Sequence, residues 1–296
     1  MVTAGIFMVA RMSPLFELSD TALNFVLVIG AITALFMGFL GIIQNDIKRV
    51  VAYSTLSQLG YMTVALGASA YSVGVFHLMT HAFFKALLFL AAGSVIMGLH
   101  HNQDIRWMGN VRKYMPVTWI TFLIGSLALI GTPFFAGFYS KDAIIEAVHA
   151  SHLPAAGFAY FSVMAGVFVT AFYSFRLYFL VFHGKERYDQ NPDAHHDDHA
   201  DDHGHDAKPH ESPWVVTLPL VLLAIPSVVI GAMTLMPILF GDFFKGLIVV
   251  DGTSHHAMAE LAEKIHGWLP MALHGFTGLP FWLALAGVVS SWYMYM

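Results

Sequence analysis

Apolar runs long enough to cross a membrane alternate with short polar stretches along the 296-residue chain. An α-helix needs about 20 residues to cross a hydrocarbon core about 30 Å thick. Runs of this length predict continuous spanning helices at residues 22–43, 47–68, 73–98, 157–182, 214–239 and 276–296. The pattern therefore predicts an all-α fold, a polytopic transmembrane helix bundle.

A further apolar stretch, residues 117–147, is interrupted by Gly131-Thr132-Pro133. Proline lacks an amide hydrogen and clashes with the preceding turn, so we interpret this stretch as one discontinuous helix made of two half-helices. A simple proline kink in a lipid-facing helix is the alternative. The charged pair Lys141-Asp142 after the break favours the discontinuous helix, because charges within a span usually face a protein interior.

The first residues, Met1 to Met12, are apolar, end at Arg11 and precede the loop signal Ser13-Pro14. They lack the basic start and the cleavage site of a signal peptide. We interpret them as the last part of another spanning helix, and we therefore expect the chain to be a piece of a longer protein.

The composition is that of a membrane protein, with 57% hydrophobic and 11% charged residues and a mean hydropathy of +0.66. Soluble domains carry about 25% charged residues. The chain contains no cysteine, which excludes disulfides, thiolate-bound iron–sulfur clusters and cysteine zinc sites. Any electron transfer must therefore take place in another subunit.

Basic residues are unevenly distributed between the loops on the two sides of the predicted bundle. One side carries Lys48, Arg49, Arg106, Arg112, Lys113, Lys185, Arg187 and Lys208, and the other carries Arg11, Lys245 and Lys264. Cytoplasmic loops are enriched in lysine and arginine, so we expect the first set to be cytoplasmic. Arg176 lies near the end of its span, where its guanidinium can reach water, and we assign it no functional role.

These patterns divide the chain into three parts. Residues 1–182 hold the partial first helix, the discontinuous helix and the other spans up to 157–182; residues 183–213 form a His/Asp-rich cytoplasmic loop; and residues 214–296 hold the last spans. The outer-side loop 241–275 contains a stretch, 257–268, with apolar side chains at spacings of three and four. That spacing predicts a short amphipathic helix lying on the outer surface.

The loop contains a histidine cluster interleaved with aspartates, a composition able to bind zinc, nickel or copper weakly. Its members are His195, His196, His199, His203 and His205, with His210 beyond them. A solvated, disordered loop explains the composition without a metal, because it has too little apolar surface to fold. We favour this second interpretation.

His77, His81 and Lys85 stand four residues apart in the span 73–98, so they share one face of its helix. An ionisable group at the bilayer centre costs about 2.5–3.5 kcal/mol, and such groups usually face a bundle interior or a wet cavity. Burial favours the neutral amine of a lysine, and histidine titrates near neutral pH. The row predicts movement of protons or ions, although a structural role for either histidine is an alternative.

Two other groups of polar residues extend this hypothesis. The middle of span 47–68 carries Ser54, Thr55, Ser57 and Gln58, which can hold a chain of water molecules against the histidines or can join helices. Lys141 is a further buried titratable group if the second half-helix is embedded, with Asp142 as its nearest countercharge. If Lys141 lies at the water interface, both are ordinary loop charges.

Three ordered strings resemble a known family. They are DIKRVVAYSTLSQLGYM at 46–62, FHLMTHAFFKALLFL at 76–90 and GFYSKD at 137–142. The chain resembles the antiporter-like subunits of proton-pumping NADH:quinone oxidoreductase, respiratory complex I. Met108-Gly109, Arg112-Lys113 and the stretch Phe182-His183-Gly184-Lys185 point to the L-type subunit at the distal end of the membrane arm.

The resemblance implies an antiporter-like fold and a proton channel. In it Lys85 is the central lysine, His77 and His81 connect along the helix, and Lys141 is the terminal lysine toward the outer side, with Asp142 as its neighbour. Quinone reduction elsewhere would drive the protons. The chain would be a non-redox subunit of a translocase in the bacterial inner membrane and would not be catalytic alone.

The resemblance also implies which partners the chain has. They are the lipid bilayer and other membrane-arm subunits of complex I, including a neighbouring antiporter-like subunit. NADH, FMN, iron–sulfur clusters and quinone would bind only to partner subunits, and we expect no cofactor in this chain and no nucleic-acid partner. Of the family's two inverted-topology repeats, the chain begins beyond the first. On this resemblance we also expect the given stretch to lie outside the long lateral helix and the anchoring span of the L-type subunit.

Two alternative functions remain open on the sequence. Large subunits of Mrp-type cation/proton antiporters share these motifs, exchange sodium and have no redox partner. A metal-ion permease with a histidine-rich cytoplasmic loop is a weaker alternative from another functional class.

Overall fold

The computed structural model describes residues 3–190, 208–250 and 255–296, and the regular structure in these ranges is helical, as predicted. The α-helices are α1 Ala4–Arg11, α2 Ser13–Phe16, α3 Asp20–Ile43, α4 Ile47–Gly67, α5 Tyr71–Gly98, α6 Pro116–Ile130, α7 Ala136–His149, α8 Ala156–Tyr178, α9 Trp214–Leu239, α10 Ala257–Lys264, α11 Trp268–Gly275 and α12 Leu279–Tyr295. Short turns are η1 Ile105–Trp107, η2 Val111–Lys113, the π-helical η3 Phe179–His183, η4 Tyr188–Gln190 and η6 Asp242–Phe244.

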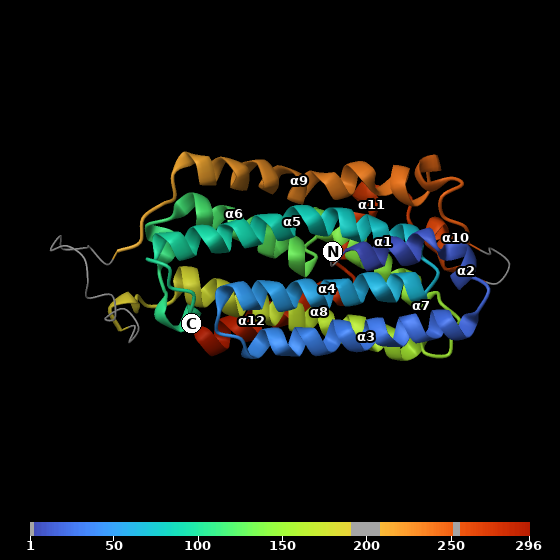
Figure 1. The fold of residues 1–296 in the computed structure, drawn as a ribbon, viewed down its shortest axis with the longest axis horizontal. Coiled ribbons are helices and arrows are strands. Elements are labelled where there is room, and N and C mark those ends of the chain that lie inside the picture. The colour runs from blue at the N-terminus through green and yellow to red at the C-terminus, as the bar shows by residue number, and fades with distance from the viewer. Residues whose placement is uncertain (1–2, 191–207, 251–254) are drawn as a thin grey trace.

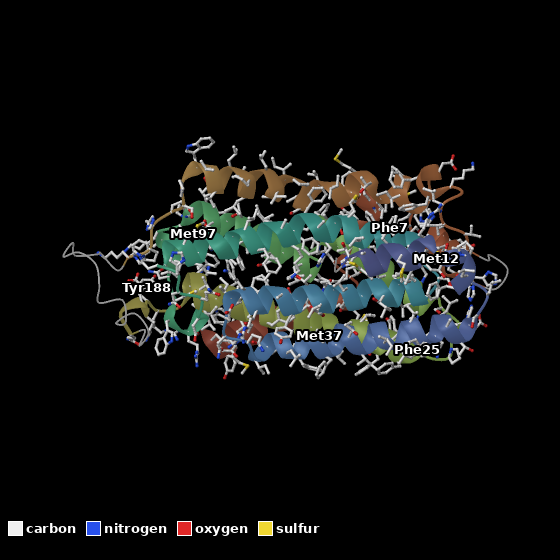
Figure 2. All side chains as sticks on the ribbon, viewed as in Figure 1. Phe7, Met12, Phe25, Met37, Met97 and Tyr188 are labelled. Atoms are coloured by element: carbon white, nitrogen blue, oxygen red, sulfur yellow. The ribbon has the colours of Figure 1, made fainter. Side chains whose placement is uncertain are left out.

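The long helices run side by side along the long axis of an elongated bundle (Figure 1). Helix α4 packs between α3 and α5, α5 also packs on α9, and α8 packs on α3 and α12. The outward faces are apolar: Phe7 and Phe25, for example, expose 61% and 66% of their surface on the outside of the bundle (Figure 2). Such a surface suits contact with lipid rather than water.

Four of the described helices are long and apolar enough to cross a membrane: α3, α5, α8 extended to His183, and α9. Helix α4 is long enough, but its polar side chains lower its hydropathy. The two halves of the predicted discontinuous helix are α6 and α7, which have 15 and 14 residues and are individually too short to span. The sequence thus identified the broken helix by its Gly–Thr–Pro interruption.

The C-terminal region differs from the prediction of one continuous span at residues 276–296. Helices α11 and α12 bend by 53° at Phe276–Gly278 and together form a fifth candidate span. Gly278 and Pro280 explain the break, because proline can occupy the first turn of a new helix but not its interior. The predicted amphipathic helix is α10, which ends at Lys264 rather than Trp268.

The loops gather at the two ends of the bundle in the predicted sets. At one end Arg112 binds His183 (2.9 Å between nitrogens) and Asp104 binds Arg106. At the other end Arg11 donates to the Leu247 carbonyl (2.9 Å). Which end faces the cytoplasm stays a prediction.

Arg176 is buried by neighbouring helices, whereas the sequence led us to expect a guanidinium exposed to water. Its side chain is buried and donates hydrogen bonds to the Gln44 carbonyl (2.6 Å) and to Asn45 Oδ1 (2.7 Å), while its guanidinium lies 5.5 Å from the centre of the Tyr295 ring. The carbonyls at the end of α3 have no helical donors left, and Arg176 supplies one. This arginine therefore joins α3, α8 and α12.

Glycines set the close approach of α3 and α4. A Cβ on Gly67 would lie 2.5 Å from the Leu27 nitrogen, and one on Gly30 would lie 2.7 Å from the Val64 nitrogen. A Cβ on Gly60 would overlap the backbone of Ala34. Small residues at such contacts let helix backbones approach in membranes, where packing replaces the hydrophobic driving force.

We predict that Gly60→Ala destabilises the protein by at least about 2 kcal/mol, because the new methyl group meets backbone that cannot move aside. Thermal unfolding of the detergent-solubilised protein measures the effect. The matched control is Gly93→Ala in α5, where nothing lies within 4 Å of the added carbon. Equal melting temperatures for the two variants would contradict the conclusion that Gly60 is needed for the close approach of α3 and α4.

Candidate functional site

The ionisable residues singled out in the sequence meet in the interior of the bundle. His77, His81 and Lys85 come from α5, and Lys141 comes from α7. Each of these four side chains is at most 4% exposed. Lys141 is therefore embedded, which decides between the two alternatives left open for it.

The row on α5 forms as predicted. The ring centroids of His77 and His81 are 6.0 Å apart, and the Phe84 ring packs edge-on against His81 at 5.3 Å. The Nε2 atom of His81 is buried and has no hydrogen-bond partner among the described residues. A buried imidazole nitrogen without a hydrogen-bond partner is costly, so the row of hydrogen bonds is interrupted at this atom.

Lys85 is held by oxygen atoms of α4. Its Nζ donates a short hydrogen bond to Ser54 Oγ and a second one, of 3.3 Å, to the Val51 carbonyl. Both acceptors are neutral. Within the described ranges the amine has no fixed counterion, which leaves it able to gain or lose a proton.

His77 connects α5 to both α4 and α7. Its Nδ1 lies 2.8 Å from Ser140 Oγ, and its Nε2 lies 3.1 Å from Gln58 Oε1. Because an amide oxygen only accepts, Nε2 of the neutral ring donates to Gln58 and Nδ1 accepts from Ser140. The Ser140 hydroxyl also lies 2.7 Å from Thr80 Oγ1. The ring is thus fixed from two sides.

Lys141 occupies an acceptor created by the helix break. Its Nζ donates to the Leu129 carbonyl at 2.8 Å. In a continuous helix that carbonyl would accept from residue 133, but Pro133 has no amide hydrogen. Gly131 adopts φ +80°, a left-handed conformation that ends α6, and a Cβ on Gly137 would overlap the Ala128 carbonyl oxygen. These two glycines let α7 start close beside the end of α6.

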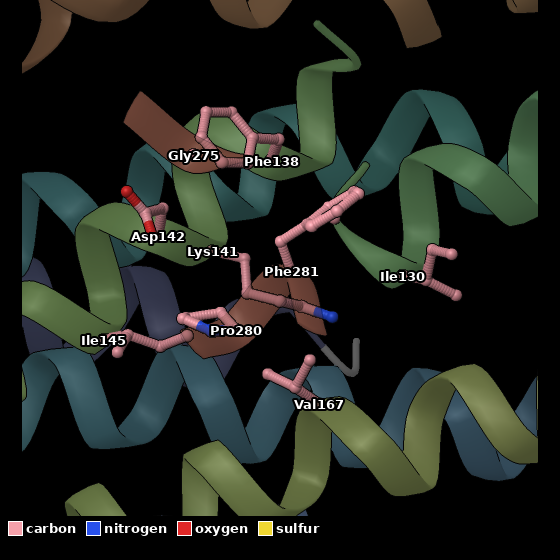
Figure 3. Close-up of a pocket in the computed structure, with 10 residues that line it drawn as sticks. Ile130, Phe138, Lys141, Asp142, Ile145, Val167, Gly275, Pro280 and Phe281 are labelled. Carbon is pink, nitrogen blue, oxygen red and sulfur yellow. The ribbon is translucent and has the colours of Figure 1, made fainter. Parts of the chain in front are cut away.

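Asp142 is not the countercharge of Lys141, which corrects that expectation. The two side chains point in different directions (Figure 3), and among the described residues Lys141 forms no ion pair with a carboxylate. The Lys141 amine instead lies 5.2 Å from the centre of the Tyr61 ring, a cation–π distance. Lys141 and Asp142 both line a pocket of about 20 Å³, which has room for an ordered water molecule.

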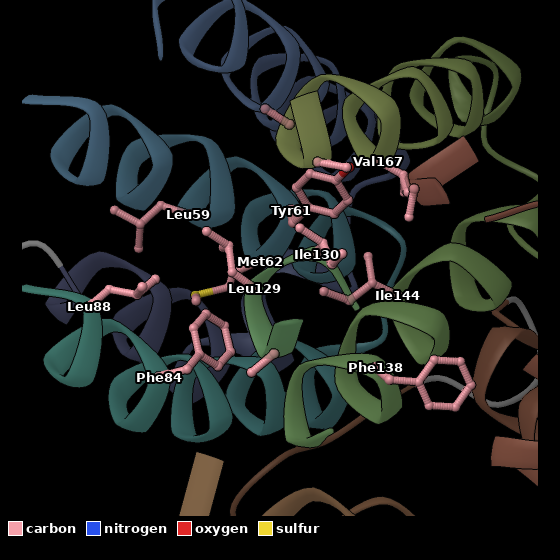
Figure 4. Close-up of a cluster of buried hydrophobic side chains, with 14 of the residues drawn as sticks. Leu59, Tyr61, Met62, Phe84, Leu88, Leu129, Ile130, Phe138, Ile144 and Val167 are labelled. Carbon is pink, nitrogen blue, oxygen red and sulfur yellow. The ribbon is translucent and has the colours of Figure 1, made fainter. Parts of the chain in front are cut away.

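The helices that carry these groups also contribute a cluster of buried apolar side chains (Figure 4). It contains buried side chains from α4, α5, α6 and α7, among them Leu59, Met62, Phe84, Leu88, Ile130 and Ile144. Such a cluster excludes bulk water and strengthens electrostatic interactions inside it. The polar groups therefore form a narrow row in an otherwise dry core.

Comparison with known families and proteins agrees with this geometry. Residues 1–171 match the transmembrane family described as NADH:quinone oxidoreductase/Mrp antiporter, which is more than half of the chain. The chain belongs to this family. The four central residues, His77, His81, Lys85 and Lys141, all lie inside the matched region.

Two relatives are similar to this chain over most of its length. "NADH-quinone oxidoreductase subunit L" of Neisseria meningitidis serogroup A is 65% identical over 100% of this chain and 44% of that protein. The protein of the same name from Rhodobacter capsulatus is 48% identical over 86% of this chain and 35% of its own length. The chain thus spans less than half the length of these relatives.

A solved structure supports the antiporter-like fold. The Mrp complex from a Dietzia species aligns with 98% of this chain and 29% of its own chain, with a TM-score of 0.68 and 22% identity. At that identity the likeness concerns the fold alone. The resemblance drawn from the sequence strings to the NADH:quinone oxidoreductase family is confirmed by the family match.

The four polar residues of α4 that the sequence predicted to face the row separate into two groups. Ser54 and Gln58 contact Lys85 and His77, as described above. Ser57 donates to the Ala34 carbonyl of α3 (2.6 Å), and Thr55 donates to the Val51 carbonyl of its own helix (3.0 Å). Ser57 therefore joins helices, and Thr55 does not reach the row.

Two contacting residues were missed from the sequence: Thr80 and Ser140. Thr80 follows His77 by three residues, so helical spacing gave a signal for it, whereas Ser140 was marked only by its place beside Lys141 in the third string. Their roles depend on how α5 and α7 meet, which the sequence pattern does not give.

The possible metal ligands His195, His196, His199, His203 and His205 lie outside the described residues. Within the described ranges, no group of three or more histidine, aspartate or glutamate side chains is placed to hold a metal ion. Whether the loop binds a metal stays a prediction of its composition.

Proposed function

We propose that this chain is part of a proton-translocating subunit of NADH:quinone oxidoreductase and carries the outer part of its proton pathway. One observation supports this above the others: Lys85 and Lys141 are both buried, neither pairs with a carboxylate in the described part of the chain, and a row of histidine and hydroxyl groups lies between them. Buried lysines cost free energy, so a membrane protein that retains two of them uses them.

The row suits stepwise proton transfer. Lys85 at one end exchanges a proton with His81 through a bound water molecule, because the two are one helical turn apart and His81 Nε2 is unpartnered. His77 continues the row through the hydrogen bond between its Nδ1 atom and the Ser140 hydroxyl. Ser140 directly precedes Lys141 in the chain. Protonation of one lysine repels a proton from the other across a medium of low dielectric constant, which couples the two sites.

The energy and the partners come from outside the chain. The relatives are named as subunits of NADH-quinone oxidoreductases, so other membrane-arm subunits, including a neighbouring antiporter-like one, are the partners we propose. NADH, FMN, iron–sulfur clusters and quinone are assigned to those partners. We assign the chain to the bacterial inner membrane with its basic loops in the cytoplasm.

An Mrp-type antiporter large subunit is the second candidate, because a chain of the Mrp complex shares the fold. The names of the relatives favour the oxidoreductase. Proton movement in vesicles that depends on NADH oxidation supports the oxidoreductase, whereas sodium-dependent proton movement without NADH supports the antiporter. A metal permease would lose transport on deletion of residues 193–210, whereas a proton channel would keep it.

We expect Lys85→Ala in the full-length subunit to lower the protons pumped per NADH oxidised by at least about twofold, because the exchangeable group is lost. Lys85→Arg is the informative companion. Its guanidinium keeps the charge but cannot release a proton, so pumping should stay low. Normal pumping in either variant would remove Lys85 from the pathway.

Lys141→Ala and Lys141→Glu should both impair pumping, but to different extents. The first removes the charge and leaves the Leu129 carbonyl without its donor, and the second places a carboxylate against that carbonyl. Pumping measured by a pH-sensitive dye in vesicles, normalised to NADH oxidation, compares them. Equal pumping by the unaltered subunit, Lys141→Ala and Lys141→Glu would show that Lys141 is an ordinary structural charge.

Ser140→Ala tests the link between α5 and α7. Losing the hydroxyl removes the donor to His77 Nδ1 and the partner of Thr80, and pumping should fall about twofold or more. The matched control is Ser57→Ala, an equally buried serine that bonds only to the α3 backbone. If Ser140→Ala and Ser57→Ala pump equally well, the hydrogen bond between Ser140 and His77 is not part of the proton pathway.

A further inference from the structure

A group of titratable side chains lies outside the row described above, at the end of the bundle that holds α2 and α10 (Figure 1). His255 lies just before α10, Glu17 follows α2, and Asp20 is the first residue of α3. The Nδ1 atom of His255 is 2.9 Å from a Glu17 carboxylate oxygen, and its Nε2 atom is 3.4 Å from an Asp20 carboxylate oxygen. Both nitrogens of one imidazole therefore face carboxylates.

The two contacts together identify His255 as an imidazolium. An ionised carboxylate only accepts hydrogen bonds, and a neutral imidazole has a single N–H, so it can donate to one of the two carboxylates but not to both. With a second proton both nitrogens donate, and the positive charge lies between two negative ones. Loss of that proton would leave a nitrogen lone pair facing a carboxylate oxygen, and the contact would weaken.

Burial increases the effect of this charge. The side chains of His255 and Glu17 are 11% and 6% exposed, and Tyr71 at the start of α5 donates to the other Glu17 oxygen at 2.8 Å. A buried carboxylate is stable only when hydrogen bonds and a countercharge replace the water that it has lost. A neutral His255 would therefore hold Glu17 less well than the imidazolium does.

Protons can reach His255 from the surface. Asp20 is exposed, and together with His255 it lines a cavity of about 70 Å³ that His152 and His256 also border. His152 lies 3.9 Å from Glu260 of α10, but both side chains are exposed, and such pairs contribute little. Histidine is the side chain that changes its charge between about pH 5 and 8, so His255 is the buried group here that can respond to pH in this range.

The contact holds one end of α10. Ala257, the first residue of this helix, is buried, and α10 packs on α7, the half-helix that carries Lys141. At the other end of α10, Lys264 donates to Glu146 of α7 at 2.6 Å. This hydrogen bond raises the pKa of Lys264, so its ammonium group stays charged at neutral pH. The His255 end is therefore the end that responds to pH.

We propose that His255, Glu17 and Asp20 form a proton-binding clasp, which holds α10 against the bundle while His255 is protonated and releases it when the proton is lost. The distribution of basic residues predicts that this end of the bundle is the outer one. The packing of α10 on α7 thus follows the proton concentration in the water on that side.

Thiol labelling of the full-length subunit in the intact complex tests the clasp, and it does not depend on pumping. This chain contains no cysteine, so Ala257→Cys places one thiol in this stretch, beneath α10. Ala259→Cys, at an exposed position of the same helix, is the matched reference. The ratio of the two labelling rates, measured by mass spectrometry of the peptides, cancels the pH dependence of thiol reactivity itself. Leu261→Cys is a second buried reporter, in which cysteine replaces a larger side chain.

We expect labelling at either buried reporter, relative to position 259, to rise at least about fivefold between about pH 6 and about pH 8, because a charged hydrogen-bond donor is lost. His255→Gln should remove this pH response, since an amide does not titrate in this range. His255→Arg keeps the charge and should hold the ratio low at both pH values. The matched control is His152→Gln, which should keep the response.

Three results would overturn the proposal. The first is an equal labelling ratio at both pH values in the protein with an unaltered His255, and the second is a pH response that persists in His255→Gln. The third is loss of the response in His152→Gln, which would assign it to the contact with Glu260. None of these results bears on whether the subunit pumps protons, so the function proposed above stands or falls separately.

Discussion

Polar atoms inside a bilayer must find their partners within the protein, because lipid offers none. The site depends on this constraint. Lys85 donates to a serine hydroxyl and a backbone carbonyl of α4, and Lys141 donates to the Leu129 carbonyl. Among the described residues neither lysine forms an ion pair with a carboxylate. Neutral acceptors hold the amine in both protonation states, whereas a paired carboxylate would be left as an uncompensated buried charge when the lysine lost its proton.

The break between α6 and α7 follows from the same constraint. Interrupting a helix inside a membrane exposes carbonyls that need new donors. Gly131 and Pro133 create the interruption, and the amide of Thr132 satisfies the Leu127 carbonyl (3.1 Å). The Leu129 carbonyl is left for Lys141. The unwound section and the buried charge therefore stabilise each other, and neither would be sustained alone in an apolar core.

Sequence patterns predicted the parts of the site that lie on one helix. The spacing of four placed His77, His81 and Lys85 on one face, and the Gly–Thr–Pro interruption located the discontinuous helix. Contacts between helices were not predicted. The selection of Ser54 and Gln58 over Ser57, and the meeting of Ser140 with His77, depend on how α4 and α7 are rotated against α5. Asp142 was misassigned because sequence neighbours on a helix point about 100° apart.

The same limit explains the errors elsewhere in the fold. Arg176 sits close to a helix end, where an arginine usually reaches water, but α12 and the end of α3 cover that position and engage it. The bend between α11 and α12 depends on Gly278 and Pro280, which an apolar run of suitable length conceals. In each case hydropathy gave the presence of the element, and the neighbouring helices decided its shape and partners.

The row of polar groups is also incomplete in a way that bears on its operation. His81 Nε2 and Gln58 Nε2 are buried without hydrogen-bond partners among the described residues, and the pocket beside Lys141, of about 20 Å³, has room for one water molecule. Protons cross such gaps only when a bound water bridges them. Apolar side chains such as Phe84 and Leu88 border these gaps, so a small movement of α5 against α6 would admit or expel that water. Under the function proposed above, we infer that a shift in a neighbouring subunit controls proton transfer through the hydration of a few sites, without any large rearrangement of the bundle.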